Sequence, residues 1–105
     1  MIKYIDKLYV SEEISDTDKI KKKIRRGAGS IDIFVIALRN GSDQLEYFHN
    51  GLFKQKIMHS YDVTIVGFAK SEADCLLIIE QIMKDTIEVT GTYDMKSYLL
   101  NCWDE

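Results

Sequence analysis

The stretch that decides the fold is residues 62–91, DVTIVGFAKSEADCLLIIEQIMKDTIEVTG. Its first part, 62–69, is rich in β-branched and other apolar residues, which favours a strand. Gly67 within this segment would allow another part of the chain to approach closely. Ser71 and Asp74 then follow with the three-residue spacing of a capping box, which marks the start of a helix. The stretch therefore predicts a strand that leads directly into a long helix.

The predicted helix runs to about Val89 and ends at Gly91, because glycine readily takes the left-handed conformation that follows a helix C-terminus. Apolar residues recur in it every three or four positions, which is typical of a stripe that faces the core. The members of this stripe are Leu76, Ile79, Met83 and Ile87. Leu77, Ile78 and Ile82 widen the stripe, so we expect the helix to be deeply buried.

The chain before this stretch contains two further strand patterns separated by a helix. Residues 4–10 alternate loosely and are rich in Tyr, Ile, Leu and Val, which favours a strand. A polar segment then leads to a helix that has Ser15 or Asp16 as its N-cap and ends near Arg26. Residues 31–38 are apolar on both faces, as in a central strand.

Three shorter segments complete the secondary structure. Residues 45–49 favour a strand that pairs back as a hairpin, with a helical turn as the alternative. After them, four apolar residues indicate one or two helical turns. These are Leu52, Phe53, Ile57 and Met58. Near the end of the sequence, Asp94 is expected to cap a short helix over 95–102.

Strands that alternate with helices favour a sheet joined by right-handed crossovers. We therefore expect an α/β fold of two or three layers, with a mainly parallel sheet of three or four strands and a possible antiparallel hairpin strand at one edge. The 105 residues show no linker or internal repeat, so we expect a single domain over 1–105. Its 46% hydrophobic and 30% charged residues are ordinary for a globular protein.

Cysteine usage and hydropathy exclude several classes of protein. The two cysteines, Cys75 and Cys102, form no CxxC pattern, and no histidine lies at ligand spacing from either. We therefore expect no metal site, disulfide framework or cofactor. The first residues carry charges where a signal peptide would need an apolar run, and the longest apolar run, 33–38, is far too short to span a membrane. These features predict a cytoplasmic protein without membrane segments.

The charge is unevenly placed, which suggests a nucleic-acid surface as one alternative. Net charge is −3, yet residues 19–26 carry six positive charges. The basic residues are Lys19, Lys21, Lys22, Lys23, Arg25 and Arg26. Such a helix could neutralise phosphates of RNA or DNA. We favour a solvated amphipathic helix, because acids precede it, bases fill its C-terminal part and no aromatic residue lies among them.

Polar residues that follow the predicted strands form a second candidate site. In an open parallel sheet, ligands gather at the carboxyl ends of the strands. The residues at those ends that could hold a small anionic ligand are Ser11, Arg39, Asn40, Lys70 and Ser71. The competing interpretation is that they are ordinary turn and cap residues.

Catalytic patterns are weak. Cys75 is in phase with the apolar side of its helix, which favours a small core residue over a reactive thiol. His49 and His59 have no paired nucleophile motif, so a structural role is favoured for both. We therefore lean against an enzyme.

Aromatic residues gather in the middle of the chain and near its end. They are Tyr47, Phe48, Phe53, Tyr93, Tyr98 and Trp103. Aromatic residues near a terminus or on an edge strand suit an interface with a protein partner or a second copy. Closure of the core over a small sheet is an equally good interpretation.

Three stretches together carry a resemblance to a known group of proteins. They are YIDKLYVS at 4–11, IVGFAK at 65–70 and TGTYDMKSYL at 90–99. The chain resembles short proteins of Gram-positive anaerobic bacteria, in which the glycine-containing strand is followed by a polar cap and a helix. The resemblance implies a bacterial cytosolic setting. It implies no activity and adds no site residues.

The leading hypothesis from the sequence is a small cytosolic interaction or regulatory module that self-associates, for example as a homodimer. Nucleic-acid binding through the basic helix is the first alternative. Binding of a small anionic ligand at the strand ends is the second.

Overall fold

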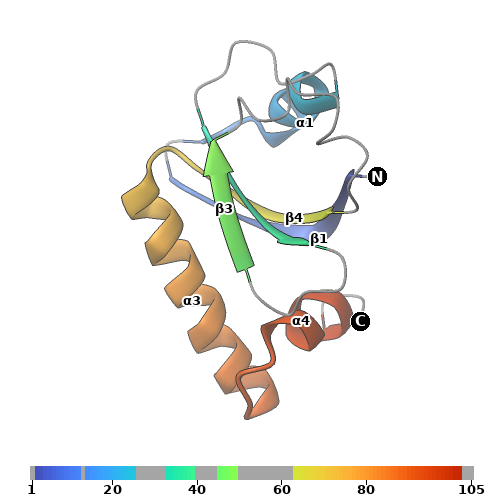
Figure 1. Cartoon of the computed structure of the whole chain (residues 1–105), viewed down its shortest axis with the longest axis vertical. Coiled ribbons are helices and arrows are strands. Elements are labelled where there is room, and N and C mark those ends of the chain that lie inside the picture. The colour runs from blue at the N-terminus through green and yellow to red at the C-terminus, as the bar shows by residue number, and fades with distance from the viewer. Residues whose placement is uncertain (1, 13, 26–32, 40–44, 50–62, 103–105) are drawn as a thin grey trace.

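A computed structural model describes residues 2–12, 14–25, 33–39, 45–49 and 63–102. The strands in it are β1 (Ile2–Val10), β2 (Phe34–Arg39), β3 (Leu45–His49) and β4 (Val63–Ala69). The helices are α1 (Thr17–Arg25), α3 (Glu72–Thr90) and α4 (Met95–Ser97), and α4 continues into a π-helical turn, η2 (Tyr98–Cys102). Figure 1 shows α1 on one side of the sheet and both α3 and α4 on the other, which makes three layers.

The described strands form one mixed sheet in the order β1-β4-β2-β3. β1 lies parallel to β4, whereas β2 is antiparallel to both of its neighbours, β4 and β3. The expectation of a mainly parallel sheet is therefore wrong. The hairpin over 45–49 is confirmed, because β3 pairs antiparallel to β2 from Leu45 to His49.

The direction of β2 explains the error. Val10 at the end of β1 pairs with Phe68, and Phe34 at the start of β2 pairs with Ala69, so β2 begins at the end of the sheet where β1 finishes. The connection from β1 to β2 therefore begins and finishes at the same end of the sheet and does not return the chain to the opposite end.

One layer of the core lies between α1 and the sheet. Ile20 and Ile24 point from α1 onto this face and are buried, as the sequence predicts. They pack with residues of the two central strands, including Val35, Ile65 and Phe68. The N-cap of α1 is Asp16, whose Oδ1 accepts a hydrogen bond of 3.0 Å from the backbone N–H of Lys19.

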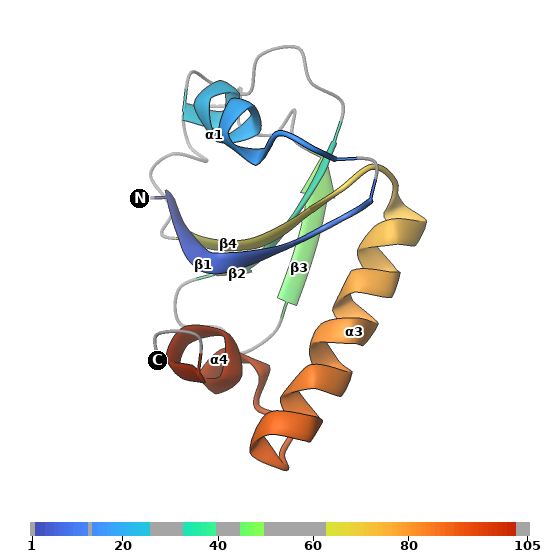
Figure 2. The same ribbon diagram turned by 180° about the vertical axis from the view of Figure 1, so that it is seen from behind.

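The second layer of the core lies between the sheet and the C-terminal helices, on the side of the sheet opposite α1 (Figure 2). Ile36 and Val66 contribute from the two central strands, and Ile82 from α3. Tyr98 and Leu99 close this layer from η2. Because both faces of the sheet are covered, the central strands are mainly apolar.

A β-bulge in β4 assigns its side chains to the two layers. Ile65 and Phe68 both belong to the α1 layer, although residues three apart in a regular strand face opposite sides. The pairing with β2 passes over Val66, so one extra residue shifts the phase. Here the backbone of β1 comes very close, because a Cβ on Gly67 would overlap the carbonyl oxygen of Tyr9. The predicted close approach at Gly67 is thus confirmed.

Both predicted ends of α3 are confirmed. Ser71 Oγ accepts a hydrogen bond of 3.1 Å from the backbone N–H of Asp74, as an N-cap does. Gly91 has a φ of 74° and donates its N–H to the carbonyl of Ile87. A similar cap starts α4, where Asp94 Oδ1 accepts from the backbone N–H of Ser97 at 3.1 Å.

The predicted core stripe of α3 is wrong for three of its four members, and the helix is not deeply buried. The side chains of Leu76, Met83 and Ile87 are 56%, 39% and 40% exposed. Ile79 is partly buried and packs against the core. The buried residues of α3 are Cys75, Ile82 and Thr86, of which Cys75 and Ile82 were expected in the core. The two lines differ by one position, a rotation of about 100° around the helix. Apolar residues cover more of the circumference of α3 than one sheet face can bury, so their spacing does not reveal which line faces inward.

No helix in the described parts of the chain is long and apolar enough to cross a membrane. The predicted helical turns at Leu52, Phe53, Ile57 and Met58 lie outside the described residues.

Candidate interaction surface

Three of the predicted strand-end residues come together at one end of the sheet. Ser11 is buried at the end of β1, and its Oγ accepts a hydrogen bond of 3.3 Å from the backbone N–H of Lys70. The same Oγ donates to Asp74 Oδ2 at 3.2 Å. Ser71 caps α3 beside them. These contacts connect the ends of β1 and β4 to the start of α3, so a structural role accounts for them.

Arg39 lies at the other end of the sheet. It pairs with Val63, the first residue of β4, whereas Lys70 follows the last residue, Ala69. Six strand residues separate the two ends, or about 20 Å. The predicted anion site does not form as a unit, because β2 runs antiparallel to β1 and β4. Asn40 lies outside the described residues.

A shallow, open pocket of about 280 Å³ adjoins Ser11. Val10, Leu77 and Ile78 form its apolar part. Its ionisable side chains are the carboxylates of Glu12 and Asp74. Negative charges would repel an anion, so this pocket does not replace the predicted site. Within the described part of the chain, no three His, Cys, Asp or Glu side chains are placed to hold a metal ion.

A polar cluster connects β1, α3 and η2 in the α3 layer. The Tyr9 hydroxyl donates to Asp85 Oδ2 at 2.7 Å and lies 2.9 Å from the hydroxyl of Tyr98. Gln81 Nε2 donates to Asp85 Oδ1 at 2.8 Å. Burial, together with the hydrogen bonds to Tyr98 and Asp85, raises the pKa of Tyr9 far above its usual range. Tyr9 therefore keeps its proton and serves as a donor between elements. Sequence reasoning missed this cluster. The only sequence signal is that Asp85 and Thr86 are adjacent polar residues within an apolar stretch of the helix.

The other predicted reactive groups have structural surroundings. Burial and the nearby carboxylates of Asp74 and Glu72 raise the pKa of Cys75 to about 11. Its thiol is therefore protonated and suited to packing, as expected. The His49 ring meets the Phe34 ring edge-on with centroids 5.5 Å apart. His59 lies outside the described residues.

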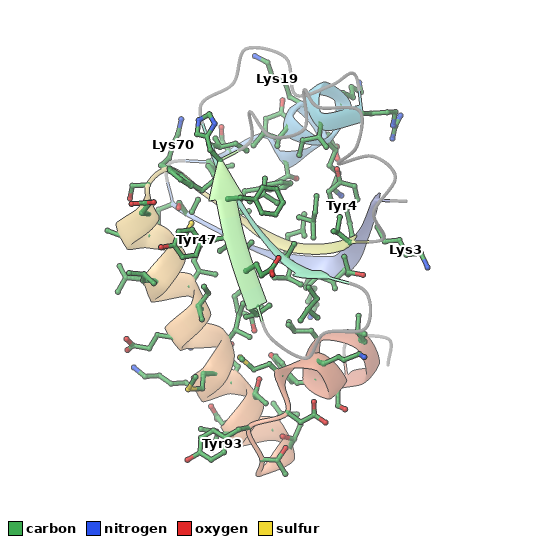
Figure 3. The ribbon with its side chains drawn as sticks, viewed as in Figure 1. Lys3, Tyr4, Lys19, Tyr47, Lys70 and Tyr93 are labelled. Carbon is green, nitrogen blue, oxygen red and sulfur yellow. The ribbon has the colours of Figure 1, made fainter. Side chains whose placement is uncertain are left out.

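The described basic residues of α1 lie on the α1 side of the sheet, away from α3. Lys19, Lys22 and Arg25 are exposed, and Figure 3 shows Lys19 on the outer side of α1. Lys21 Nζ lies 4.9 Å from the ring centroid of Tyr4, a cation–π contact that holds one of these charges against the sheet. The side chain of Lys23, and Arg26, lie outside the described residues.

The predicted aromatic residues do not form one surface. Tyr47 is half-exposed on β3, and its ring packs against Phe34 at 6.5 Å. Phe48 points to the opposite face and packs on the α1 layer. Tyr98 is buried, whereas Tyr93 is exposed beyond the end of α3 (Figure 3). Phe53 and Trp103 lie outside the described residues.

The most distinctive apolar surface is on α3. Leu76, Met83 and Ile87 are spaced by seven and four residues, so they lie on one side of the helix. We call these three residues the α3 ridge. Beside it Lys84 Nζ and Glu80 Oε1 form an exposed ion pair at 3.0 Å. The apolar spacing identified these residues, but it assigned them to the core.

The α3 ridge lies on the side of α3 that is nearer to β3. Asp85 is about 180° around the helix from the ridge and bonds to Tyr9 on β1. β1 and β3 are at opposite ends of the strand order. Tyr47 projects from the same face of the sheet, because it packs on Phe34, a residue of the α3 layer. The ridge and Tyr47 therefore present apolar surface on the same side of the molecule.

No protein-family model matches this sequence, and no curated protein or solved structure is significantly similar to it. The surface of the chain itself is therefore the basis for a functional conclusion.

Proposed function

We propose that this protein is a small interaction or regulatory module that self-associates, and that the α3 ridge is the contact surface. The observation that carries the proposal is the exposure of Leu76, Met83 and Ile87 along one line of a capped helix. Single exposed apolar residues are normal on protein surfaces, but an apolar line along a helix is typical of a helix-packing surface. The proposed setting is the bacterial cytoplasm.

The size of the ridge predicts how strong the association is. Full burial of a Leu, Ile or Met side chain stabilises by about 1.5–3 kcal/mol, so a half-exposed one recovers roughly 1 kcal/mol. Both copies contribute three such side chains. Association itself costs at least several kcal/mol. The ridge by itself therefore supports only a weak dimer, in which association depends on the abundance of the protein.

Sedimentation equilibrium over a range of concentrations tests the proposal. We expect the full chain to approach the mass of a dimer as concentration rises, and Leu76→Glu to shift it towards the monomer. Val89→Glu is a matched control, because Val89 is 60% exposed and lies about 140° around the same helix from Leu76. A wild-type chain that stays monomeric up to about 1 mM, or equal effects of the two substitutions, would contradict the proposal.

Nucleic-acid binding by α1 is a second candidate, supported by the exposed Lys19, Lys22 and Arg25. Its surface lies across the sheet from α3, so it can be tested separately. We expect binding of RNA or duplex DNA to weaken steeply with salt, and Lys19→Ala with Lys22→Ala to reduce that salt dependence. Affinity that does not change with salt would exclude α1 as the contact surface.

A further inference from the structure

We infer that the partner of the α3 ridge is a second copy of this chain, with the two α3 helices packed antiparallel around a two-fold axis near Gln81 and Ile82. This inference rests on the proposed self-association and specifies its geometry. It follows from three features of α3, which are the spacing of its apolar residues, the position of its lysine and its place at the outside of the fold.

The apolar residues are placed symmetrically along the helix. Leu76 and Ile87 have their midpoint between Gln81 and Ile82, and the partly buried Ile79 and the exposed Met83 have theirs at Gln81. An antiparallel pair with its axis at this point sets Leu76 of one copy against Ile87 of the other. It sets Ile79 against Met83 in the same way. A two-fold interface requires such self-complementarity, because each copy uses the same surface.

The charges beside the ridge select the antiparallel direction. Lys84 is the one basic residue in the sequence of α3, and Glu80 lies next to it on the same flank of the ridge. In an antiparallel pair, like flanks face each other. Each Lys84 then meets Glu80 of the second copy as well as its own, which makes two ion pairs across the interface. In a parallel pair this flank would face the other flank of the partner, which carries no lysine.

The helix dipoles favour the same direction. Each α3 has a positive N-terminus and a negative C-terminus, and it has no basic residue in its last turn. Antiparallel packing places each negative end beside the positive end of the partner. The helix is also well positioned for packing, because α3 runs along the outside of the fold in both views (Figures 1 and 2).

Charge reversal in the full chain tests the geometry. Glu80→Lys places lysines against lysines across the antiparallel interface, and Lys84→Glu places glutamates against glutamates. We expect each variant alone to dimerise about tenfold more weakly than the wild type. Both sites are well exposed, so the fold should be retained, which circular dichroism can confirm. An equimolar mixture of the two variants should form a heterodimer at least as stable as the wild-type dimer, because every cross-interface pair is then opposite in charge.

The outcomes separate this inference from the proposed function. A dimer that Leu76→Glu disrupts, but that neither charge variant weakens and mixing does not restore, would overturn the antiparallel pairing alone. A wild-type chain that is monomeric throughout would overturn both. Recovery only in the mixture, and loss of that recovery at high salt, would support the antiparallel pair.

Discussion

The hydroxyl of Tyr9 donates a hydrogen bond of 2.7 Å to Oδ2 of Asp85, a residue 76 positions away in the sequence. This contact joins the first strand to the middle of α3, and the Tyr98 hydroxyl at 2.9 Å adds η2 to the same cluster. One phenol group therefore connects the first strand to two elements in the C-terminal part of the chain.

Removal of this hydroxyl is expected to destabilise the fold. Tyr9→Phe should lower the free energy of unfolding by roughly 1–3 kcal/mol, because it removes the hydrogen bond that the part-buried Asp85 Oδ2 accepts. Urea denaturation measures the change. Tyr93→Phe is the matched control, since Tyr93 is 74% exposed, and we expect it to change stability by less than about 0.5 kcal/mol. Equal stabilities for the two variants would mean that the Tyr9 cluster is not a stabilising contact.

A methyl group at Gly67 is expected to disturb the sheet. Gly67→Ala would place its Cβ against the carbonyl oxygen of Tyr9, so β1 or β4 must shift, which costs roughly 1–3 kcal/mol. The comparison is Gly91→Ala, where no atom lies within 4 Å but φ is 74°. That variant should lose roughly 1–2 kcal/mol through backbone strain alone. Thermal unfolding measures the stability of both variants. A Gly67→Ala variant as stable as the wild type would disprove the close approach of the β1 backbone to Gly67.

The revised orientation of α3 predicts opposite results for two similar substitutions. Ile82 is fully buried, so Ile82→Ala should destabilise by about 2–5 kcal/mol through loss of packing and formation of a cavity. Leu76→Ala should cost less than about 1 kcal/mol in the monomer, because that side chain is largely exposed. Chemical denaturation at low protein concentration measures both. A larger loss of stability for Leu76→Ala than for Ile82→Ala would support the core stripe that the spacing alone predicts.

The raised pKa of the Cys75 thiol predicts how the free energy of unfolding changes at alkaline pH. Its pKa is about 11 in the folded chain against an ordinary 9.0, because burial and neighbouring carboxylates disfavour the thiolate. Folding therefore holds the proton more tightly, and this contribution is complete below pH 9 and is lost as pH rises towards 11. We expect the free energy of unfolding to fall over this interval.

The control for this prediction is Cys75→Ala, which removes the titrating group. Its stability should decline less between pH 9 and pH 11 than that of the wild type. Tyr9 adds to the decline in both proteins, since its raised pKa acts in the same direction. Parallel curves for the wild type and the variant would exclude a contribution from Cys75.

The candidate site was predictable only in part. Ser11, Lys70 and Ser71 were expected to meet, and they do, because β1 and β4 are parallel neighbours. Arg39 was expected beside them, but the reversal of β2 places it at the far end of the sheet. The α3 ridge was visible in the sequence as an apolar pattern, and only its exposure shows that it is a surface.

The sequence by itself determined the local structure of this protein. The caps at Asp16, Ser71, Asp94 and Gly91 depend on bonds between residues three or four apart, so the neighbouring side chains are sufficient to specify them. The tertiary structure alone decided the direction of β2 and which line of α3 turns inward. Both depend on contacts between distant segments that compete for the same apolar surface, and an alternating or helical pattern satisfies more than one arrangement of those contacts.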